Sequence, residues 1–307
     1  MQTAYISHPL CLLHDQGGFH PESAARIHAI EDQLIASGMM DYLLRLEAPE
    51  VTREQLLRVH AEEYIDLLES SVPAQGIVQL EADIIMNAYS YQAALRAAGA
   101  VVLGVDMVMA HKVENVFCSV RPPGHHAERT HGMGFCLLNN LAIGAAHALA
   151  QHGLQRVAIV DFDVHHGNGT DNIFKNDPRV LLCSTFQHPF YPYSGLDNNN
   201  EHIVNVPLAA GSDGEVFRAA VTQHWLPALE KFQPQFIFIA AGFDAHYSDD
   251  MARLNFNESD YAWVTRTLRD VAVKHAQGRI VSALEGGYEL HALGRSVLAH
   301  IKELSGL

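Results

Sequence analysis

The sequence predicts an α/β fold built on a mainly parallel sheet with helices on both faces. Strand-like apolar runs alternate with helical segments through most of the chain, and the runs are continuous in their apolar character. Such runs are typical of parallel strands that are buried on both faces. No repeat, low-complexity tract or Pro-, Gly- or Ser-rich linker interrupts the 307 residues. We therefore expect one domain over residues 1–307.

The first third of the chain is expected to supply one strand and three helices. The expected elements are a strand at 3–7, a loop at 8–21, and helices at 23–37, 52–68 and 89–110. Gly38 is placed to end the first helix, and Thr52 with Gln55 matches a capping box that opens the second. The third helix is rich in alanine, and Gly99 and Gly104 would allow close packing against a neighbour.

The rest of the chain alternates strands and helices more regularly. The expected strands are 116–120, 157–161, 180–184, 203–206, 236–241 and 279–284, and the expected helices are 139–152, 170–176, 213–232, 258–276 and 289–304. Two long irregular stretches, 8–21 and 187–202, are candidates for the walls of a binding site.

The charge balance is acidic and argues against a polyanionic partner. The chain has 20 Lys and Arg against 35 Asp and Glu, a formal charge of −15. Nucleic-acid affinity depends on basic side chains, so we expect no direct nucleic-acid binding. The negative charge would attract a cationic substrate, although we expect its main effect to be on the solubility of the protein. The composition leaves the oligomeric state open, including a homo-oligomer.

The cysteines and the N-terminus indicate a cytoplasmic protein. The four cysteines form no Cys-x-x-Cys pair, and Cys118 and Cys183 fall in strand-like runs where reduced, buried thiols are expected. The N-terminus has no basic region followed by an apolar stretch. We find no apolar run near the length of roughly 20 residues that spans a bilayer, so no membrane association is expected.

Polar side chains follow four of the expected strands directly. The clusters are Arg121-Pro122-Pro123-Gly124-His125-His126, Asp161-Phe162-Asp163-Val164-His165-His166-Gly167, Gly242-Phe243-Asp244 and Glu285-Gly286-Gly287-Tyr288. In open parallel sheets, ligands bind outside the carboxyl ends of the strands. The four clusters are therefore expected to converge on one rim of the sheet and to form a metal-dependent active site.

Asp163, His165 and Asp244 are the candidate metal ligands. Asp161, Asp163 and His165 alternate as the chain leaves a strand, and Asp244 arrives from another strand end. One imidazole and two carboxylates leave an open position for water and substrate, as in catalytic zinc sites. The same mixed N/O set would accept Fe²⁺, Co²⁺ or Mn²⁺.

The remaining cluster residues suit proton transfer and oxyanion stabilisation. His125 and His126 are assigned to acid–base work because imidazole titrates near neutral pH, and Asp161 is the expected partner that orients one of them. Tyr288, after two glycines, could donate a hydrogen bond to a developing oxyanion. Phe135 could line a narrow channel for an alkyl chain or be ordinary core, and spacing alone favours neither.

Several motifs together resemble the zinc-dependent deacetylases of the arginase/deacetylase superfamily, most closely class II histone deacetylases and their bacterial relatives. The resemblance runs from about Ser7 to the last helix. The motifs are His20-Pro21-Glu22-Ser23-x-x-Arg26, Val59-His60-x-x-x-Tyr64, Arg121-Pro122-Pro123-Gly124-His125-His126, Gly134-Phe135-Cys136-x-x-Asn139-Asn140 and Asp161-x-Asp163-x-His165-His166-Gly167-Asn168-Gly169-Thr170.

The resemblance implies a three-layer α/β/α fold with a parallel sheet of about eight strands. It implies zinc on Asp163, His165 and Asp244, Tyr288 as oxyanion donor, and His126 as general base and acid, with His125 as its electrostatic partner held by Asp161. It also implies substrate contacts from Phe135, Gly134 and, by a looser match, Asp83. A structural potassium ion is implied on Asp161, Asp163, His165, Ser184 and Thr185.

Two positions depart from the family pattern. Asn168 stands where class I members carry a second carboxylate, which favours the class II or bacterial branch. Phe186 replaces a frequent histidine and leaves the outer pocket wall undefined.

The resemblance implies hydrolysis of the N-acetyl amide of an acetylated lysine in a peptide or protein. Acetylpolyamine hydrolysis ranks second, because that branch often has Tyr where this chain has Arg121. A non-catalytic acetyl-lysine-binding protein would lack a ligand or the tyrosine, but every expected position is filled. An arginase-like two-manganese enzyme needs further ligands, and Val164 stands where one could have been supplied.

Overall fold

An eight-stranded parallel sheet forms the centre of the computed structural model, which describes residues 2–196 and 200–307. The strand order is β2-β1-β5-β10-β9-β6-β7-β8. The strands are β1 (Ala4–Ser7), β2 (Leu44–Glu47), β5 (Asn115–Cys118), β6 (Val157–Asp161), β7 (Val180–Gln187), β8 (Ile203–Leu208), β9 (Ile237–Ala241) and β10 (Ile280–Leu284). β10, from the end of the chain, pairs with β5 and β9. The predicted parallel sheet is confirmed.

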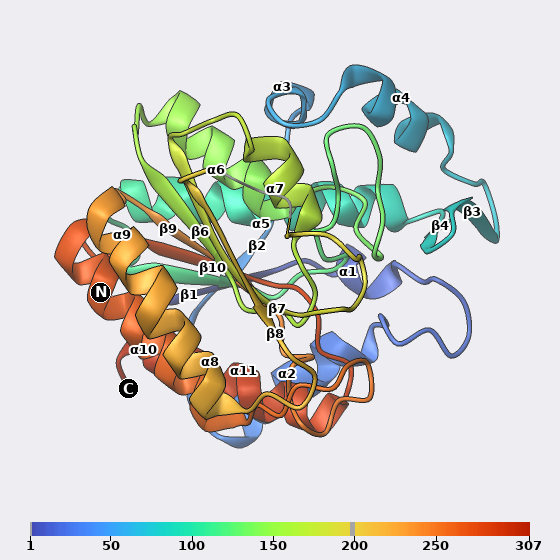
Figure 1. The fold of residues 1–307 in the computed structure, drawn as a ribbon. Coiled ribbons are helices and arrows are strands. Elements are labelled where there is room, and N and C mark those ends of the chain that lie inside the picture. The colour runs from blue at the N-terminus through green and yellow to red at the C-terminus, as the bar shows by residue number, and fades with distance from the viewer. Residues whose placement is uncertain (1, 197–199) are drawn as a thin grey trace.

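Helices cover both faces of the sheet and complete the three predicted layers (Figure 1). One face packs against α3 (Arg53–Leu57), α4 (Glu62–Ser70), α5 (Ser90–Met109), α6 (Asn140–Gln151) and α7 (Asn168–Phe174). The other face packs against α2 (Ala25–Ala36), α8 (Gly214–Ala220), α9 (Leu226–Phe232), α10 (Glu258–His275) and α11 (Leu290–Ser305). Each face has its own apolar core, as the continuous apolar strands require.

Three strands were not predicted, and all of them are partly exposed. β2 is an edge strand whose residues alternate between intermediate and exposed positions. β3 (Ile77–Glu81) and β4 (Ile84–Asn87) form a separate antiparallel hairpin, and β3 shows the same alternation. Short strands with polar residues on one side lack the continuous apolar signal of the central strands.

The helix predicted over 52–68 is wrong in its continuity, because the chain breaks between α3 and α4. The cause is His60, which is buried and bonded across to two other segments. Its Nε2 accepts from the backbone N–H of Asn139 at 3.0 Å, and its Nδ1 lies 2.9 Å from the carbonyl of Glu128. The helix predicted over 213–232 is confirmed, with a π-helical turn at Val221–Trp225 between α8 and α9. The loop 8–21 contains a short helix, α1 (Leu10–Leu13).

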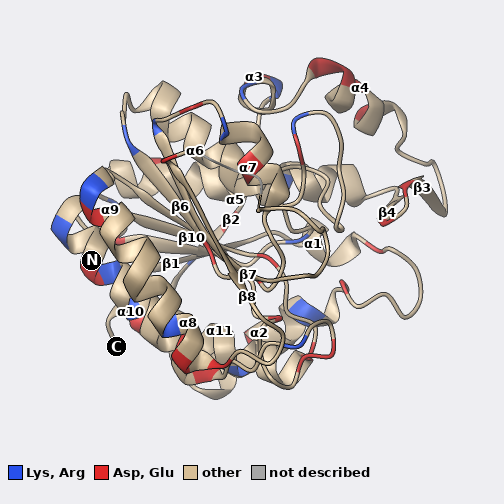
Figure 2. Ribbon diagram, viewed as in Figure 1, with Lys and Arg blue, Asp and Glu red and all other residues tan. Residues whose placement is uncertain are grey.

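The charged residues lie mainly on the outer surface. In the view of Figure 2, basic and acidic positions are interspersed over the outer helices, with no broad basic face on the side shown. This distribution agrees with the acidic net charge of −15.

α5 (Ser90–Met109) is the one described helix that is long and apolar enough to cross a membrane, which corrects the expectation that no apolar segment approaches that length. Within the fold, 61% of its most apolar window is buried. It packs against the sheet and α6, so its apolar side chains form part of the protein core.

The two glycines of α5 allow the close approach that was predicted for them. A methyl group on Gly104 would contact the side chains of Val116 and Val281 in the sheet. A methyl group on Gly99 would overlap the backbone carbonyl of Pro49, which is fixed in the loop before α3.

We expect Gly99→Ala to destabilise the protein by about 1–3 kcal/mol, the usual cost of overpacking a core. Alanine ordinarily stabilises a helix relative to glycine by about 1 kcal/mol, so a net loss would report the overlap with Pro49. Urea unfolding of the two proteins measures the difference. Gly18→Ala, where a methyl group meets no atom within 4 Å, is the control. Equal midpoints for G99A and the parent protein would contradict the packing argument.

Candidate active site

The four polar clusters meet at the carboxyl ends of β5, β6, β9 and β10, as predicted. The ligand atoms of Asp163, His165 and Asp244 all lie within 4.8 Å of one another. His165 Nδ1 is 2.9 Å from an oxygen of Asp163 and 3.3 Å from an oxygen of Asp244. All three side chains are buried. The structure therefore brings the three predicted ligands into one group that can hold a metal ion.

Backbone donors hold the two carboxylates of this group in place. The N–H of Gly286 donates to Asp163 Oδ2 at 2.8 Å, and the N–H of Val164 donates to Asp244 Oδ1 at 3.0 Å. A methyl group on Gly286 would overlap both carboxylates, so the close approach of β10 to the group needs glycine.

The three groups strongly influence one another's protonation. Burial and the neighbouring Asp163 raise the pKa of Asp244 to about 6. Burial opposes the charged form of His165, but the adjacent carboxylates of Asp163 and Asp244 outweigh burial and raise its pKa to about 9. His165 therefore holds a proton at neutral pH, and a cation bound by this group would displace it.

His125 and His126 are adjacent but have different partners. Their ring centroids are 4.0 Å apart. His125 Nδ1 lies 2.9 Å from Asp161 Oδ2, as predicted, whereas His126 Nδ1 lies 2.7 Å from the amide oxygen of Asn168. Burial disfavours the charged form of His125, but Asp163 and Asp161 outweigh burial and raise its pKa well above the usual value.

The pKa of His126 moves the opposite way. Burial, together with the positive charge of His125 and His165, lowers the pKa of His126 well below its usual value. The pair therefore consists of one charged and one neutral imidazole, and His126 is the neutral one.

Glu285 fixes the turn that carries the two histidines, a role that sequence reasoning did not assign. Its Oε2 accepts from the backbone N–H groups of Gly124 at 2.7 Å and His125 at 3.0 Å. Burial raises the pKa of Glu285 to about 7. The position of Glu285 at the end of a buried strand was the available signal.

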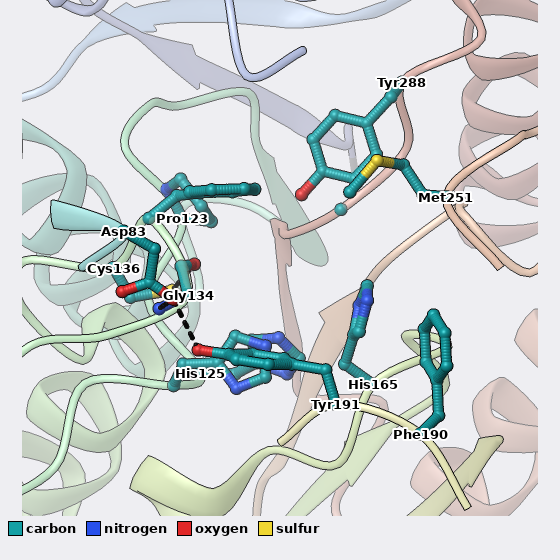
Figure 3. Close-up of a pocket in the computed structure, with 13 residues that line it drawn as sticks. Asp83, Pro123, His125, Gly134, Cys136, His165, Phe190, Tyr191, Met251 and Tyr288 are labelled. Atoms are coloured by element: carbon teal, nitrogen blue, oxygen red, sulfur yellow. Dashed lines mark hydrogen bonds between the residues drawn. The ribbon is translucent and has the colours of Figure 1, made fainter. Parts of the chain in front are cut away.

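A cavity of about 230 Å³ lies above this group (Figure 3). Its walls come from six segments: the β3–β4 turn, the 123–136 stretch, the stretch after β6, the loop after β7, Met251 and the end of β10. The lining residues are Asp83, Pro123, His125, His126, Gly134, Phe135, Cys136, His165, Phe190, Tyr191, Met251, Gly286 and Tyr288. Of the two loops predicted as walls of a binding site, the loop 187–202 supplies Phe190 and Tyr191. Residues 197–199 of this loop lie outside the described residues. The described loop 8–21 supplies no lining residue.

The aromatic walls settle two points that the sequence left open. Phe135 has a positive φ of 66° and a partly exposed ring that lines the cavity, so it is channel wall and not core. Phe190 stacks on His165 with ring centroids 5.4 Å apart. Phe186 is buried and packs on His166 at 4.8 Å, so it does not form the outer wall.

Asp83 lies at the β3–β4 turn and ties two cavity walls together. Its Oδ2 accepts from the Tyr191 hydroxyl at 2.7 Å and from the N–H of Gly134 at 3.0 Å. Tyr191 also packs edge-on against His126 with centroids 5.4 Å apart. Figure 3 shows the dashed contact between Asp83 and Tyr191 at the side of the cavity.

Tyr288 points its hydroxyl into the cavity from the opposite wall (Figure 3). Asp249 Oδ2 accepts from the backbone N–H groups of Tyr288 at 2.6 Å and Glu289 at 3.0 Å. The Arg26 guanidinium lies 4.9 Å from the centroid of the Tyr288 ring. Tyr288 is thus held both at its backbone and at its ring.

Comparison with known proteins gives the family. The histone deacetylase domain model matches residues 20–304. The chain belongs to the histone deacetylase family. It is 38% identical to a probable deacetylase of Archaeoglobus fulgidus and 36% identical to a histone deacetylase-like amidohydrolase of Pseudomonas aeruginosa, covering 100% of this chain and 87% of each relative. The crystal structure of the HDA15 HD domain matches with a TM-score of 0.94 and 35% identity, covering 99% of this chain and 88% of that one. The predicted family, fold and amide-hydrolase class are confirmed.

Two of the residues predicted to bind potassium in this deacetylase lie on neighbouring strands. Asp161 and Ser184 are paired in register on β6 and β7. The hydroxyls of Ser184 and Thr185 are buried and have no hydrogen-bond partner among the described residues. Val164 is fully buried in the apolar core, so it leaves no room for the extra ligand of a two-manganese site.

A second group of Asp and His in the described chain could hold a metal by distance alone. His147 Nε2 and His152 Nε2 lie 2.9 and 2.8 Å from the same oxygen of Asp106. Arg58 and the side-chain amide of Gln55 both donate toward His147 Nδ1, at 3.2 and 3.4 Å. Because these two donors face Nδ1, the Nε2–H of His147 is the group that donates to Asp106. The hydrogen bonds of this group join α5 to α6.

We expect Gly134→Ala to lower deacetylase turnover at least about tenfold, because a methyl group there would overlap the His126 ring. The φ of Gly134 is +56°, so the substitution also costs backbone strain. Gly153→Ala is a matched control, since its φ is +66° and a methyl group there meets no atom within 4 Å. Turnover of an acetylated peptide is the measurement. Equal losses in the two variants would show that strain alone, and not displacement of His126, is responsible.

Proposed function

We propose that this chain hydrolyses the N-acetyl amide of acetyl-lysine side chains at a zinc ion held by Asp163, His165 and Asp244. The observation that carries the proposal is the grouping of these three ligands, from two separate strand ends, at the base of the cavity beside His126. Acetylated lysine in a peptide or protein is the proposed substrate because several relatives are named histone deacetylases.

The residues present fit a divalent metal ion. The donor set is one imidazole and two carboxylates, and Asp244 Oδ2 is buried without a hydrogen-bond partner among the described residues. Glycines 242 and 286 leave the space beside the carboxylates clear of side chains. Zn²⁺ fits this set, and Fe²⁺ or Co²⁺ would also be accepted. When bound, such an ion polarises the acyl carbonyl and lowers the pKa of water toward about 7.

His126 is the proposed general base and acid. Its low pKa keeps it neutral, and its Nδ1 bond to Asn168 leaves Nε2 free to accept a proton from the attacking water. The charged His125 beside it disfavours a second positive charge. His126 therefore passes its proton to the amine nitrogen as the carbon–nitrogen bond breaks. Asp161 holds His125 in the charged form.

Tyr288 is the proposed donor to the carbonyl oxygen as that atom gains negative charge. Burial raises the pKa of the Tyr288 phenol well above its usual value, so the hydroxyl keeps its proton at neutral pH. The hydrogen bonds that the backbone N–H groups of Tyr288 and Glu289 donate to Asp249 fix the position of Tyr288 before substrate binds, as electrostatic stabilisation of an oxyanion requires.

The cavity walls fit a linear alkyl chain that enters beside Phe135 and Tyr191. Gly134 and Asp83 lie on the same side of the cavity, and Asp83 is placed to receive substrate donors near its turn. Arg121, at the position where the polyamine branch often has Tyr, is fully buried and donates to Glu22 and to the carbonyl of Cys11. It does not line the cavity.

Three further proposals accompany the activity. A potassium ion on Asp161, Asp163, His165, Ser184 and Thr185 would satisfy the unpaired hydroxyls of Ser184 and Thr185. Residues 1–307 would act as one catalytic domain, because strands from both ends of the chain pair in one sheet. A cytoplasmic setting fits the four cysteines, which are buried and unpaired.

We expect an acetyl-lysine peptide to exceed N-acetylputrescine in kcat/KM by at least about tenfold, that is about 1.4 kcal/mol of transition-state stabilisation. Both substrates should be assayed with the zinc-loaded enzyme while bound metal is quantified. A reversed preference would assign the chain to polyamine hydrolysis. Binding of the peptide without turnover would identify a non-catalytic acetyl-lysine-binding protein.

We expect Tyr288→Phe to reduce turnover by about 10²–10³, the usual cost of removing one oxyanion donor. Zinc content should remain full, because Tyr288 is not one of the three grouped ligands. Tyr42→Phe, on an exposed side chain outside the cavity, is the control. Unchanged turnover in Y288F would refute the assigned role.

A further inference from the structure

A chain of hydrogen bonds runs from His126 away from the substrate cavity and ends on a carboxylate. His126 Nδ1 lies 2.7 Å from Asn168 Oδ1, and Asn168 Nδ2 donates to Glu128 Oε1 at 2.7 Å. Asn168 is buried, and both ends of its side-chain amide have hydrogen-bond partners within the protein. Met133 sulfur is a further, weaker acceptor near Nδ2 at 3.1 Å.

The order of atoms in this chain is set by Glu128. A carboxylate only accepts hydrogen bonds, so it selects the NH₂ end of Asn168 and directs the amide oxygen toward His126. That oxygen also only accepts, so the proton of neutral His126 must sit on Nδ1. Nε2 is then unprotonated and can act as the base.

Glu128 itself does not line the substrate cavity. Its side chain is 21% exposed and lines a separate cavity of about 330 Å³ on the other side of Asn168. Its backbone N–H donates to the carbonyl of His131 at 2.9 Å, which fixes the stretch after the histidine pair. Any effect of Glu128 on the reaction must therefore pass through Asn168.

We propose that Glu128 is a positioning residue that fixes the tautomer of His126 through Asn168. The proposal rests on the proposed role of His126 as general base. In the neighbouring His125, a carboxylate contacts Nδ1 directly, because Asp161 lies next to it. In His126, the neutral amide of Asn168 stands between Nδ1 and the carboxylate of Glu128. Glu128 can therefore orient His126 without forming an ion pair with it.

The first test is Glu128→Gln. Glutamine can donate as well as accept, so the Asn168 amide is free to turn and present its NH₂ group to His126 Nδ1. The proton of His126 then moves to Nε2, the position that must be free. We expect kcat to fall at least about tenfold with KM within about twofold and zinc content unchanged, because a misplaced proton disables the base without altering the cavity. Glu63→Gln, an exposed position with the same change in charge, should leave kcat unaltered.

The second test places the same substitution in an Asn168→Asp background. Both oxygens of the introduced carboxylate accept hydrogen bonds, so the His126 proton stays on Nδ1 whatever side chain stands at position 128. Glu128 and the introduced carboxylate would also repel each other at this distance. We expect E128Q to leave kcat unchanged or to raise it in this background. A role of Glu128 in packing alone predicts the same loss in both backgrounds, and that result would overturn the proposal.

The third measurement does not depend on activity. Nitrogen-15 NMR of the zinc-loaded protein, with the His126 signals assigned by comparison with H126Q, reports which ring nitrogen carries the proton. Protonated Nδ1 in the parent and protonated Nε2 in E128Q support the proposal, and an unchanged tautomer overturns it. If the tautomer moves but H126Q retains full turnover, the role of Glu128 stands and the assignment of His126 as base fails.

Discussion

The structure around the site depends on one constraint: two carboxylates and an imidazole are buried within 4.8 Å of one another. Buried like charges are costly unless each oxygen has a partner. Backbone N–H groups reduce this cost: those of Gly286 and His165 donate to Asp163, and that of Val164 donates to Asp244. Those donors lie in the turns that follow the strands, so the carboxyl edge of the sheet is shaped around the group.

The same constraint separates the two histidines. His125 can be charged because Asp161 and Asp163 lie beside it, and its charge then keeps His126 neutral. Two identical side chains, adjacent in sequence, thus acquire opposite protonation states from their partners. Asn168 is central to this difference, since an amide orients His126 without adding a negative charge next to it.

The sequence predicted the central strands well because those strands are buried on both faces and read as continuous apolar runs. It also predicted which residues follow their carboxyl ends. The parallel arrangement then placed His126, His165 and Tyr288 around one cavity, with Asp163 and Asp244 grouped with His165. It did not predict β2 or the β3–β4 hairpin, whose alternating exposure gives a weak signal in short segments. Nor did it predict the break at His60, because that break follows from bonds to residues 68 and 79 positions away.

By itself, the sequence determined the α/β class, the order of the central elements and the identity of the residues at the strand ends. These depend on local periodicity and on the chain direction of each strand. Only the tertiary structure decided which partners these residues have: Asp83 with Tyr191, Asp249 with Tyr288, and Asn168 with Glu128. Such pairs join segments 39 to 108 residues apart. They form because of the way in which loops pack over the edge of the sheet, and local sequence patterns do not specify that packing.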